Sequence, residues 1–161
     1  AHMYMRKVGD KYKWNKATCI HTPIISSLKA SGERMDSFDH KMSKSNPNGA
    51  ILLHDSPEKL RKKIRKAYLN PNERNSPIYE LIEHIILPEF GEIKVTPKPE
   101  YGEPSVYSTL DSFIDAVSNE IIHPMDAKFA VADSISKLLS PINNYFQENP
   151  ELLEIVESFS N

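Results

Sequence analysis

The sequence predicts a mainly α-helical chain that begins with a short α/β segment. Three observations support this prediction. Residues 17–21 form a short apolar run ahead of a polar loop, apolar residues after position 55 recur mostly at helical spacing, and residues 91–108 concentrate Gly and Pro. Hydrophobic residues make up 39% of the 161 residues, which is enough for a buried core.

The composition narrows the class of protein. The formal net charge is −2, so a nucleic-acid surface would have to be a local patch. Cys19 is the only cysteine, which excludes an internal disulfide and favours an intracellular, cytoplasmic setting. One Cys and scattered His residues offer no metal ligands at useful spacing, and no apolar run approaches the ~20 residues of a membrane helix. Residues 1–3 are interpreted as a cloning remnant.

The first segment of the chain combines a basic stretch with a short strand. Residues 4–16 are basic and aromatic, and we favour a solvated helix end that turns at Gly9–Asp10 over an RNA-binding arm. Residues 17–21 are expected to form a short buried strand, which Pro23 ends. A loop after such a strand fits the rule that ligands bind at the carboxyl ends of strands in open α/β sheets.

That loop carries the string Lys41-Met42-Ser43-Lys44-Ser45. Two lysines three residues apart place two ammonium groups beside two hydroxyls, and ammonium groups bind phosphate as point charges. A loop of this kind can stabilise charge that develops on a phosphate during a reaction. The alternative is a solvated basic loop without a ligand.

A basic helix follows the loop. Ser56 is the expected N-cap and Pro57 the first helical residue. The apolar face is expected to comprise Leu60, Ile64, Ala67 and Tyr68, and basic residues should cover the remainder. We interpret those residues as a phosphate-backbone contact surface, with a merely solvated helix as the alternative. They are Lys59, Arg61, Lys62, Lys63, Arg65 and Lys66.

The remaining elements are mostly helices. Proline and capping residues mark their expected ends. Residues 91–108 are expected to be an extended insertion with one short hairpin, because Ile93 and Val95 alternate with polar residues. Helices are expected from Ser76–Pro77 to Pro88, after Thr109, after His123–Pro124 with a kink or interruption at Pro141, and after Asn149–Pro150.

Four strings together resemble one enzyme family. Lys41 to Ser45 resembles the lysine motif of class I aminoacyl-tRNA synthetases. With residues 55–58, 63–68 and 123–128, the last of which reads His-Pro-Met-Asp-Ala-Lys, the chain resembles the archaeal and eukaryotic type of tyrosyl-tRNA synthetase. The resemblance implies that residues 4–55 end a Rossmann-like catalytic domain and that residues 56–161 form a helical anticodon-binding domain.

The resemblance also implies partners. The parent enzyme would join tyrosine to tRNA-Tyr with ATP and substrate-bound Mg, and would be a homodimer. The family's His-x-Gly-His motif and tyrosine pocket are not found here, so the chain alone is expected to be inactive. The sibling tryptophanyl enzyme and a non-catalytic RNA-binding module with a vestigial lysine loop are the alternatives.

The resemblance assigns site residues position by position. Lys41 and Lys44 would act on the ATP phosphates, with Met42, Ser43 and Ser45 beside them. Tyr101 would stack on the first anticodon base, unless it only covers a loop, and Asp126 would accept hydrogen bonds from that base. The other implied tRNA-binding residues are Lys59, Lys62, Lys63 and Lys66 on the basic helix, and His123, Pro124, Met125 and Lys128 around the base, although His123–Pro124 is also an ordinary helix start.

Overall fold

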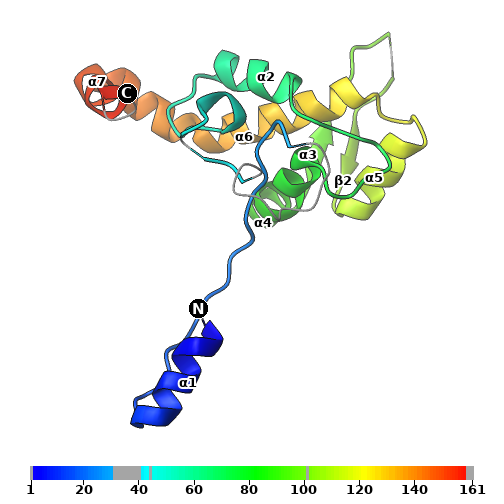
Figure 1. The fold of residues 1–161 in the computed structure, drawn as a ribbon. Helices are drawn as coiled ribbons and strands as arrows, with labels where there is room; N and C mark the ends of the chain where they lie inside the picture. Colours follow the sequence, from blue (N-terminus) through cyan, green and yellow to red (C-terminus); the bar gives the residue numbers. More distant parts are fainter. Residues whose placement is uncertain (1, 31–40, 44, 101, 159–161) are drawn as a thin grey trace.

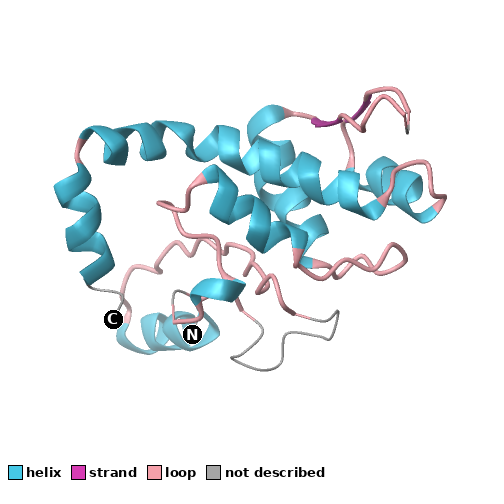
Figure 2. Ribbon diagram, turned by 90° about the horizontal axis from the view of Figure 1, so that it is seen from above, coloured by secondary structure: helices cyan, strands magenta, loops and turns pink. Residues whose placement is uncertain are grey.

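The computed structural model describes residues 2–30, 41–43, 45–100 and 102–158 (Figure 1). Helices form nearly all of the regular structure in this part of the chain, as the sequence predicts (Figure 2). The elements in chain order are α1 (His2–Tyr12), the 3₁₀ turn η2 (Pro47–Gly49), α2 (Pro57–Arg65), α3 (Pro77–Leu81), the π-helical turn η3 (Ile82–Ile86), α4 (Leu87–Phe90), β1 (Ile93–Val95), β2 (Ser105–Tyr107), α5 (Leu110–Ser118), α6 (Pro124–Glu148) and α7 (Pro150–Ser158).

The longest helix, α6, is the centre of the helical region. Helix α2 packs along it, and α3, η3 and β1 also contact it (Figure 1). Val131 and Ile135 of α6 are buried, as the helical spacing predicts. On α5, the buried ring of Phe113 lies edge-on to Tyr79 and Tyr107, with ring centroids 6.3 and 5.6 Å apart. This core therefore joins helices α2 to α6 with the hairpin.

Side chains close the starts of three helices where the sequence predicts them. Ser56 Oγ accepts a hydrogen bond from the Lys59 N–H at 3.3 Å, and Thr109 Oγ1 accepts one from Ser112 at the same distance. His123 Nδ1 accepts from the Met125 N–H at 3.1 Å. Each cap satisfies one of the N–H groups that a helix start leaves unpaired.

The predicted helix end at Pro88 is wrong. The chain stays helical through α3, η3 and α4 and ends at Gly91, whose φ of 74° is the left-handed conformation of a helix C-cap. In η3 the Leu87 N–H donates to the carbonyl of Ile82, five residues back. The wider π-helical turn makes room for the Pro88 ring, which would clash with a carbonyl in a regular α-helix.

The predicted interruption at Pro141 is also absent, because α6 runs through it to Glu148. A proline leaves the carbonyl four residues earlier without its helical donor. Here that carbonyl belongs to Lys137, and the Ser140 hydroxyl donates to it at 2.9 Å.

The hairpin prediction is confirmed: β1 and β2 pair antiparallel with Ile93 opposite Tyr107, and Ile93 and Val95 are buried.

The N-terminal region differs from the prediction in two places. Helix α1 runs through Gly9 and Asp10, and the reversal comes at Lys13, which has a φ of 54°. The Trp14 N–H then returns to the Gly9 carbonyl at 3.0 Å, which moves the turn to the end of the helix. His2 and Met3, interpreted as part of a cloning remnant, lie in the first turn of α1.

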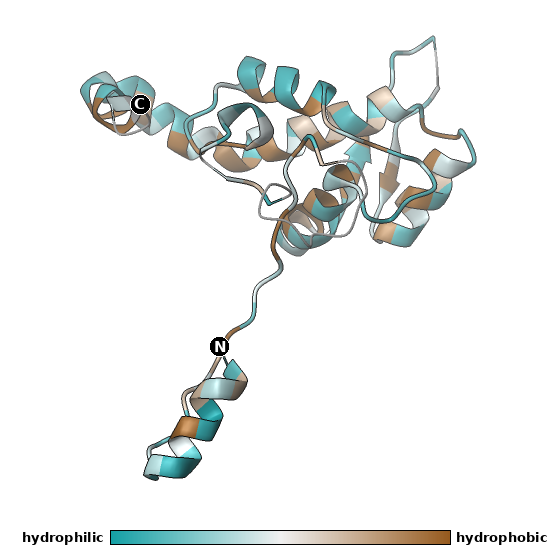
Figure 3. Cartoon of the chain, viewed as in Figure 1, coloured by the Kyte–Doolittle hydropathy of each residue, from teal (hydrophilic) through white to brown (hydrophobic). Residues whose placement is uncertain are grey.

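Residues 17–21 form no strand, so that prediction is wrong. They run as an extended segment between α1 and the rest of the chain (Figures 1 and 3). Ile20 in this segment is 88% exposed. A strand forms only when a neighbouring chain supplies hydrogen bonds. No described residue forms a β-bridge with this segment, and the hydrogen bond between the rings of His21 and His2 joins side chains only. None of the described helices is long and apolar enough to cross a membrane.

Candidate functional site

Two segments join at the base of the loop that carries the lysine string. Ser26 and Lys41 form an isolated antiparallel bridge, and the Met42 N–H donates to the Ile25 carbonyl at 2.8 Å. On the other side, the Leu28 N–H donates to the Gly49 carbonyl at 2.9 Å. The ends of the lysine loop are therefore held together by backbone hydrogen bonds.

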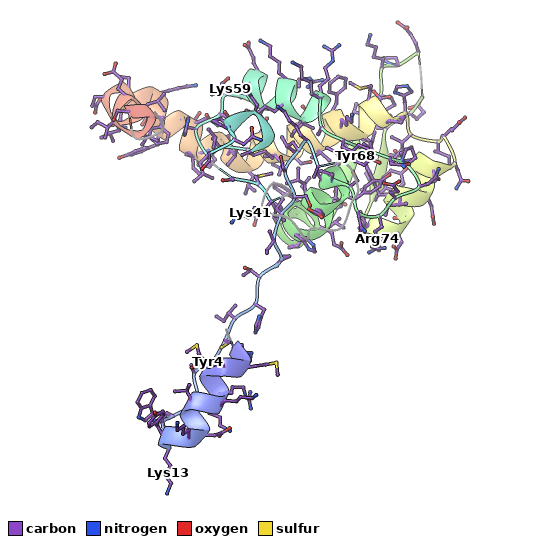
Figure 4. The ribbon with its side chains drawn as sticks, viewed as in Figure 1. Tyr4, Lys13, Lys41, Lys59, Tyr68 and Arg74 are labelled. Carbon is purple, nitrogen blue, oxygen red and sulfur yellow. The ribbon has the colours of Figure 1, made fainter. Side chains whose placement is uncertain are left out.

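Within the lysine string, neighbouring side chains have different environments. Lys41, which Figure 4 labels, is exposed, whereas Met42 is half-buried and packs against the core. The Ile51 N–H donates to Met42 Sδ at 3.4 Å. Ser43 Oγ accepts from the Ser45 N–H at 3.3 Å, which turns the chain. Lys44 lies outside the described residues.

The helical region holds the base of the loop from one side. Glu80 of α3 accepts hydrogen bonds from the Ser26 N–H at 2.7 Å and from the Ser26 hydroxyl at 2.9 Å. The Tyr68 N–H donates to the Leu28 carbonyl at 2.9 Å. A Cβ atom at Gly49 would lie 2.4 Å from Ser27 Oγ, so glycine permits the close approach of the two segments.

The exposed basic residues of α2 and of its C-terminal end differ in their contacts with α6. Lys59, Lys62 and Lys66 are exposed, as the sequence predicts (Figure 4 marks Lys59). Arg61 pairs with Asp133 at 2.8 Å and stacks over Phe129, with its guanidinium carbon 4.1 Å from the ring centroid. Arg61 is therefore tied to α6, while the three lysines are accessible to a polyanion.

The prediction that Lys63 belongs to the exposed surface is wrong. Its side chain is only 8% exposed, and Nζ lies 2.5 Å from Asp55 Oδ2 and 2.9 Å from the Ala50 carbonyl. The position follows the helical repeat, because residue 63 is three after the buried Leu60 and four before the buried Ala67. A phosphate backbone cannot reach this ammonium group.

Asp55 is fully buried and accepts several hydrogen bonds. Burial alone would raise the pKa of its carboxyl group, but the hydrogen bonds from Lys63 and from the Leu52 N–H outweigh burial and lower the pKa. Asp55 Oδ1 forms an ion pair with Lys59 Nζ at 3.2 Å. Asp55 is therefore a buried carboxylate between one buried and one exposed lysine.

A cavity of about 790 Å³ opens between the hairpin and the start of α6. His123, Met125 and Asp126 contribute to its lining, together with residues on both sides of position 101. Tyr101 itself lies outside the described residues. Asp126 is half-buried in the first turn of α6, where the helix dipole favours a negative charge. The structure thus brings three of the predicted anticodon-site residues together at one cavity.

Lys128 does not line this cavity, contrary to its expected place beside Asp126. Its ammonium group donates instead to the Arg65 carbonyl at the end of α2, at 3.3 Å. Burial lowers the pKa of Lys128. Lys128 lies two positions after Asp126, which on a helix turns its side chain to a different face. Pro124 also does not line the cavity between the hairpin and α6.

Some cavity residues were not anticipated. Ile121 is 73% exposed beside the cavity and follows Glu120, a non-glycine residue with a φ of 60°. Phe129 lines the cavity while stacking with Arg61. No local pattern marks these residues, because the hairpin that completes the cavity comes from a distant part of the chain.

In the described part of the chain no group of three or more His, Cys, Asp or Glu residues could hold a metal ion.

The chain resembles known proteins over nearly its whole length. The family model described as "tRNA synthetases class I (W and Y)" matches residues 2–140. A tyrosine–tRNA ligase of Picrophilus torridus is 36% identical over 88% of this chain and 43% of the relative, and that of Aeropyrum pernix is 33% identical over 98% and 46%.

Solved structures agree with these relatives. A tyrosyl-tRNA synthetase from Pyrococcus horikoshii complexed with L-tyrosine has a TM-score of 0.74, with 33% identity over 86% of this chain and 40% of that structure. A tyrosyl-tRNA synthetase from Aeropyrum pernix has a TM-score of 0.78, with 30% identity over 98% and 44%. The chain therefore spans less than half the length of these relatives and matches their C-terminal portion.

Proposed function

The chain belongs to the class I tRNA synthetase family of the tryptophan and tyrosine enzymes, and we propose that it supplies two parts of a tyrosine–tRNA ligase. One part is the loop that stabilises the ATP phosphates. The other is the surface that binds tRNA-Tyr and reads its anticodon. The resemblance to archaeal-type tyrosyl-tRNA synthetases is confirmed by the relatives and the solved structures.

The cavity between the hairpin and α6 is the observation that carries this proposal. It gathers His123, Met125 and Asp126 at a helix start, together with Gly102, which follows Tyr101 in the sequence. An unpaired base is read by stacking on an aromatic face and by hydrogen bonds to its Watson–Crick edge. A carboxylate only accepts hydrogen bonds, so Asp126 suits the ring N–H and amino group of guanine.

The lysine loop supports the catalytic half of the proposal. Lys41 and Lys44 would stabilise charge on the ATP phosphates, with Mg bound to the nucleotide. Lys41 is exposed beside a loop base that backbone bonds and Glu80 hold in place. Two ammonium groups carried by a chain whose base is held in place would be presented to the phosphates from one side.

The exposed residues of α2 support tRNA binding. Lys59, Lys62 and Lys66 form a patch that would contact the phosphate backbone without reading sequence. Lys63 is left out of this proposal because its side chain is buried. The binding should be weak and salt-dependent in a chain whose net charge is −2.

The domain boundary is also part of this proposal. Residues 4–55 would be the edge of a Rossmann-like catalytic domain, and residues 56–161 an anticodon-binding domain. The exposed residues 17–21 support it, because an apolar extended segment fits a strand whose sheet is made by another part of a longer protein. The chain alone should then form no aminoacyl-adenylate.

The tryptophanyl alternative is not favoured. The family model covers both enzymes, but the relatives named above are tyrosine–tRNA ligases. A non-catalytic RNA-binding module would keep the cavity and the α2 patch without needing the lysine loop. Loss of tyrosine activation in a Lys41→Ala variant of the longer protein would exclude that reading.

Anticodon variants test the proposal most directly. We expect Asp126→Ala to abolish the preference for guanine at the first anticodon position, while affinity for the other three bases stays nearly unchanged. The measurement is binding of four tRNA-Tyr variants that differ only at that base. A good base contact contributes roughly 1–3 kcal/mol, which is about 5- to 150-fold in affinity.

Glu58→Ala, on the exposed face of α2, is the matched control because it removes a carboxylate away from the cavity. It should leave the base preference intact. If Asp126→Ala weakens all four tRNAs equally, Asp126 only stabilises the start of α6, and the anticodon proposal is wrong at this position.

A further inference from the structure

The buried ion pair of Lys63 and Asp55 has no role in the function proposed so far. We propose that Lys63 is a positioning residue for the lysine string: it acts through the peptide group between Ala50 and Ile51 to hold Met42 in place. The catalytic consequence of this inference rests on the proposed function of Lys41 and Lys44.

One peptide group makes the connection. Its carbonyl, from Ala50, accepts a hydrogen bond from Lys63 Nζ at 2.9 Å. Its N–H, from Ile51, donates to Met42 Sδ at 3.4 Å. A peptide group is planar, so fixing the direction of the carbonyl also fixes the direction of the N–H. The ammonium group of α2 thereby sets the orientation of the donor that contacts Met42.

Met42 lies between the two functional lysines. Its own N–H donates to the Ile25 carbonyl at 2.8 Å, and its side chain packs against the core. A displacement of Met42 would therefore displace Lys41 on one side and the chain leading to position 44 on the other. Catalytic groups must be held closely to their working geometry by supporting contacts, and Met42 provides such a contact here.

The charges of the pair favour a positioning role over simple stabilisation. The side chain of Asp55 is fully buried and that of Lys63 is 8% exposed. A buried ion pair is often no more stabilising than apolar residues of similar volume, because removing both charges from water is costly. A directional hydrogen bond, unlike apolar packing, fixes one orientation of the Ala50–Ile51 peptide group.

The same carboxylate reaches the tRNA-facing side of α2. Asp55 Oδ1 lies 3.2 Å from Nζ of the exposed Lys59, while Oδ2 lies 2.5 Å from Nζ of the buried Lys63. The exposed patch and the base of the lysine loop therefore share one carboxylate. Lys63 therefore lies between the lysine string, which would act on ATP, and the exposed lysines of α2, which would bind tRNA.

The first test measures the connection without any activity. Lys63→Met alone would leave a buried unpaired carboxylate, so the test variant is Lys63→Met combined with Asp55→Asn, which removes both charges at similar volume. We expect amide hydrogen exchange at Ile51 and Met42 to become at least about tenfold faster. Amides of α6, such as those of Val131 and Ile135, should keep their protection and show that the core is intact.

Lys137→Met is the matched control, because it removes an exposed lysine of α6 that stacks over Phe90, away from the loop. It should leave exchange at Ile51 and Met42 unchanged. Unchanged exchange at these two amides in the double variant, with the core protected, would overturn the inference.

The second test uses the longer tyrosine–tRNA ligase that contains this chain. The double variant should lower the rate of tyrosine-dependent ATP–pyrophosphate exchange about tenfold, with the KM for tyrosine unchanged. Lys41→Ala is measured in parallel and should lower the rate on the order of a hundredfold. If Lys41→Ala lowers the rate and the double variant does not, the positioning inference fails alone. If Lys41→Ala has no effect, the proposed function of the loop fails and the inference fails with it.

Discussion

Two adjoining parts of the N-terminal third of the chain behave in opposite ways. Residues 2–24 leave Tyr4, Trp14 and Ile20 exposed, and Figure 1 shows α1 standing apart from helices α2 to α6. The base of the lysine loop, residues 25–28 and 41–52, instead bonds to the helical region through Glu80, Tyr68 and Lys63. Segments with similar apolar content thus differ because only one of them finds partners in the helical region.

The largest difference is expected from truncating an apolar side chain in each part. Leu28 is 1% exposed in the core and Ile20 is 88% exposed. Leu28→Ala should lower the free energy of unfolding by roughly 2–5 kcal/mol, because it leaves a cavity. Ile20→Ala should change it by less than about 0.5 kcal/mol. Urea unfolding measures both, and equal losses would show that residues 17–21 are buried in solution.

Acid unfolding gives a smaller contrast between two aspartates. The pKa of Asp55 is lowered in the folded protein by the hydrogen bonds that outweigh its burial. Its contribution to stability is therefore present above the ordinary pKa of an aspartate and is lost as the pH falls through the lowered value. Hydrogen bonds to a charged group contribute roughly 1.5–3 kcal/mol each, so unfolding should become easier in this acidic range.

The matched control lies in the N-terminal region. Asp10 pairs with Lys16 at 2.7 Å, but both side chains are about half exposed, and such surface pairs contribute about 0–1 kcal/mol. Asp55→Asn should flatten the acid limb of the plot of stability against pH, whereas Asp10→Asn should leave it in place. The same slope in both variants would mean that other carboxylates cause the acid unfolding.

One substitution made at two glycines should give small effects of opposite sign. Gly49→Ala would place a Cβ atom 2.4 Å from Ser27 Oγ at the loop base and should destabilise the fold by roughly 1–3 kcal/mol. Gly9→Ala lies inside α1, where the nearest atom to the new Cβ is 3.6 Å away. It should favour helix by roughly 0.5–1 kcal/mol. Circular dichroism and thermal unfolding would record a loss of stability for one variant and a gain of helix for the other.

The sequence by itself determined the features that depend on nearby residues. The caps at Ser56 and Thr109 were predictable, because a capping side chain bonds to an N–H two or three residues ahead. At His123 the sequence predicted only the helix start, and the structure added the side-chain cap. The hairpin and the buried positions of α5 and α6 followed from periodicity in the same way. The resemblance to the synthetase family also needed only short strings such as residues 123–128.

Only the tertiary structure decided the features that depend on distant partners. Pro88 lies inside a helix because η3 widens the turn before it, and residues 17–21 form no strand because no described neighbour pairs with them. Lys63 has the same charge as Lys62, yet it is buried because Asp55 and the Ala50 carbonyl receive its ammonium group. Charge and propensity belong to a residue, whereas burial and hydrogen-bond partners are set by the chain packed around it.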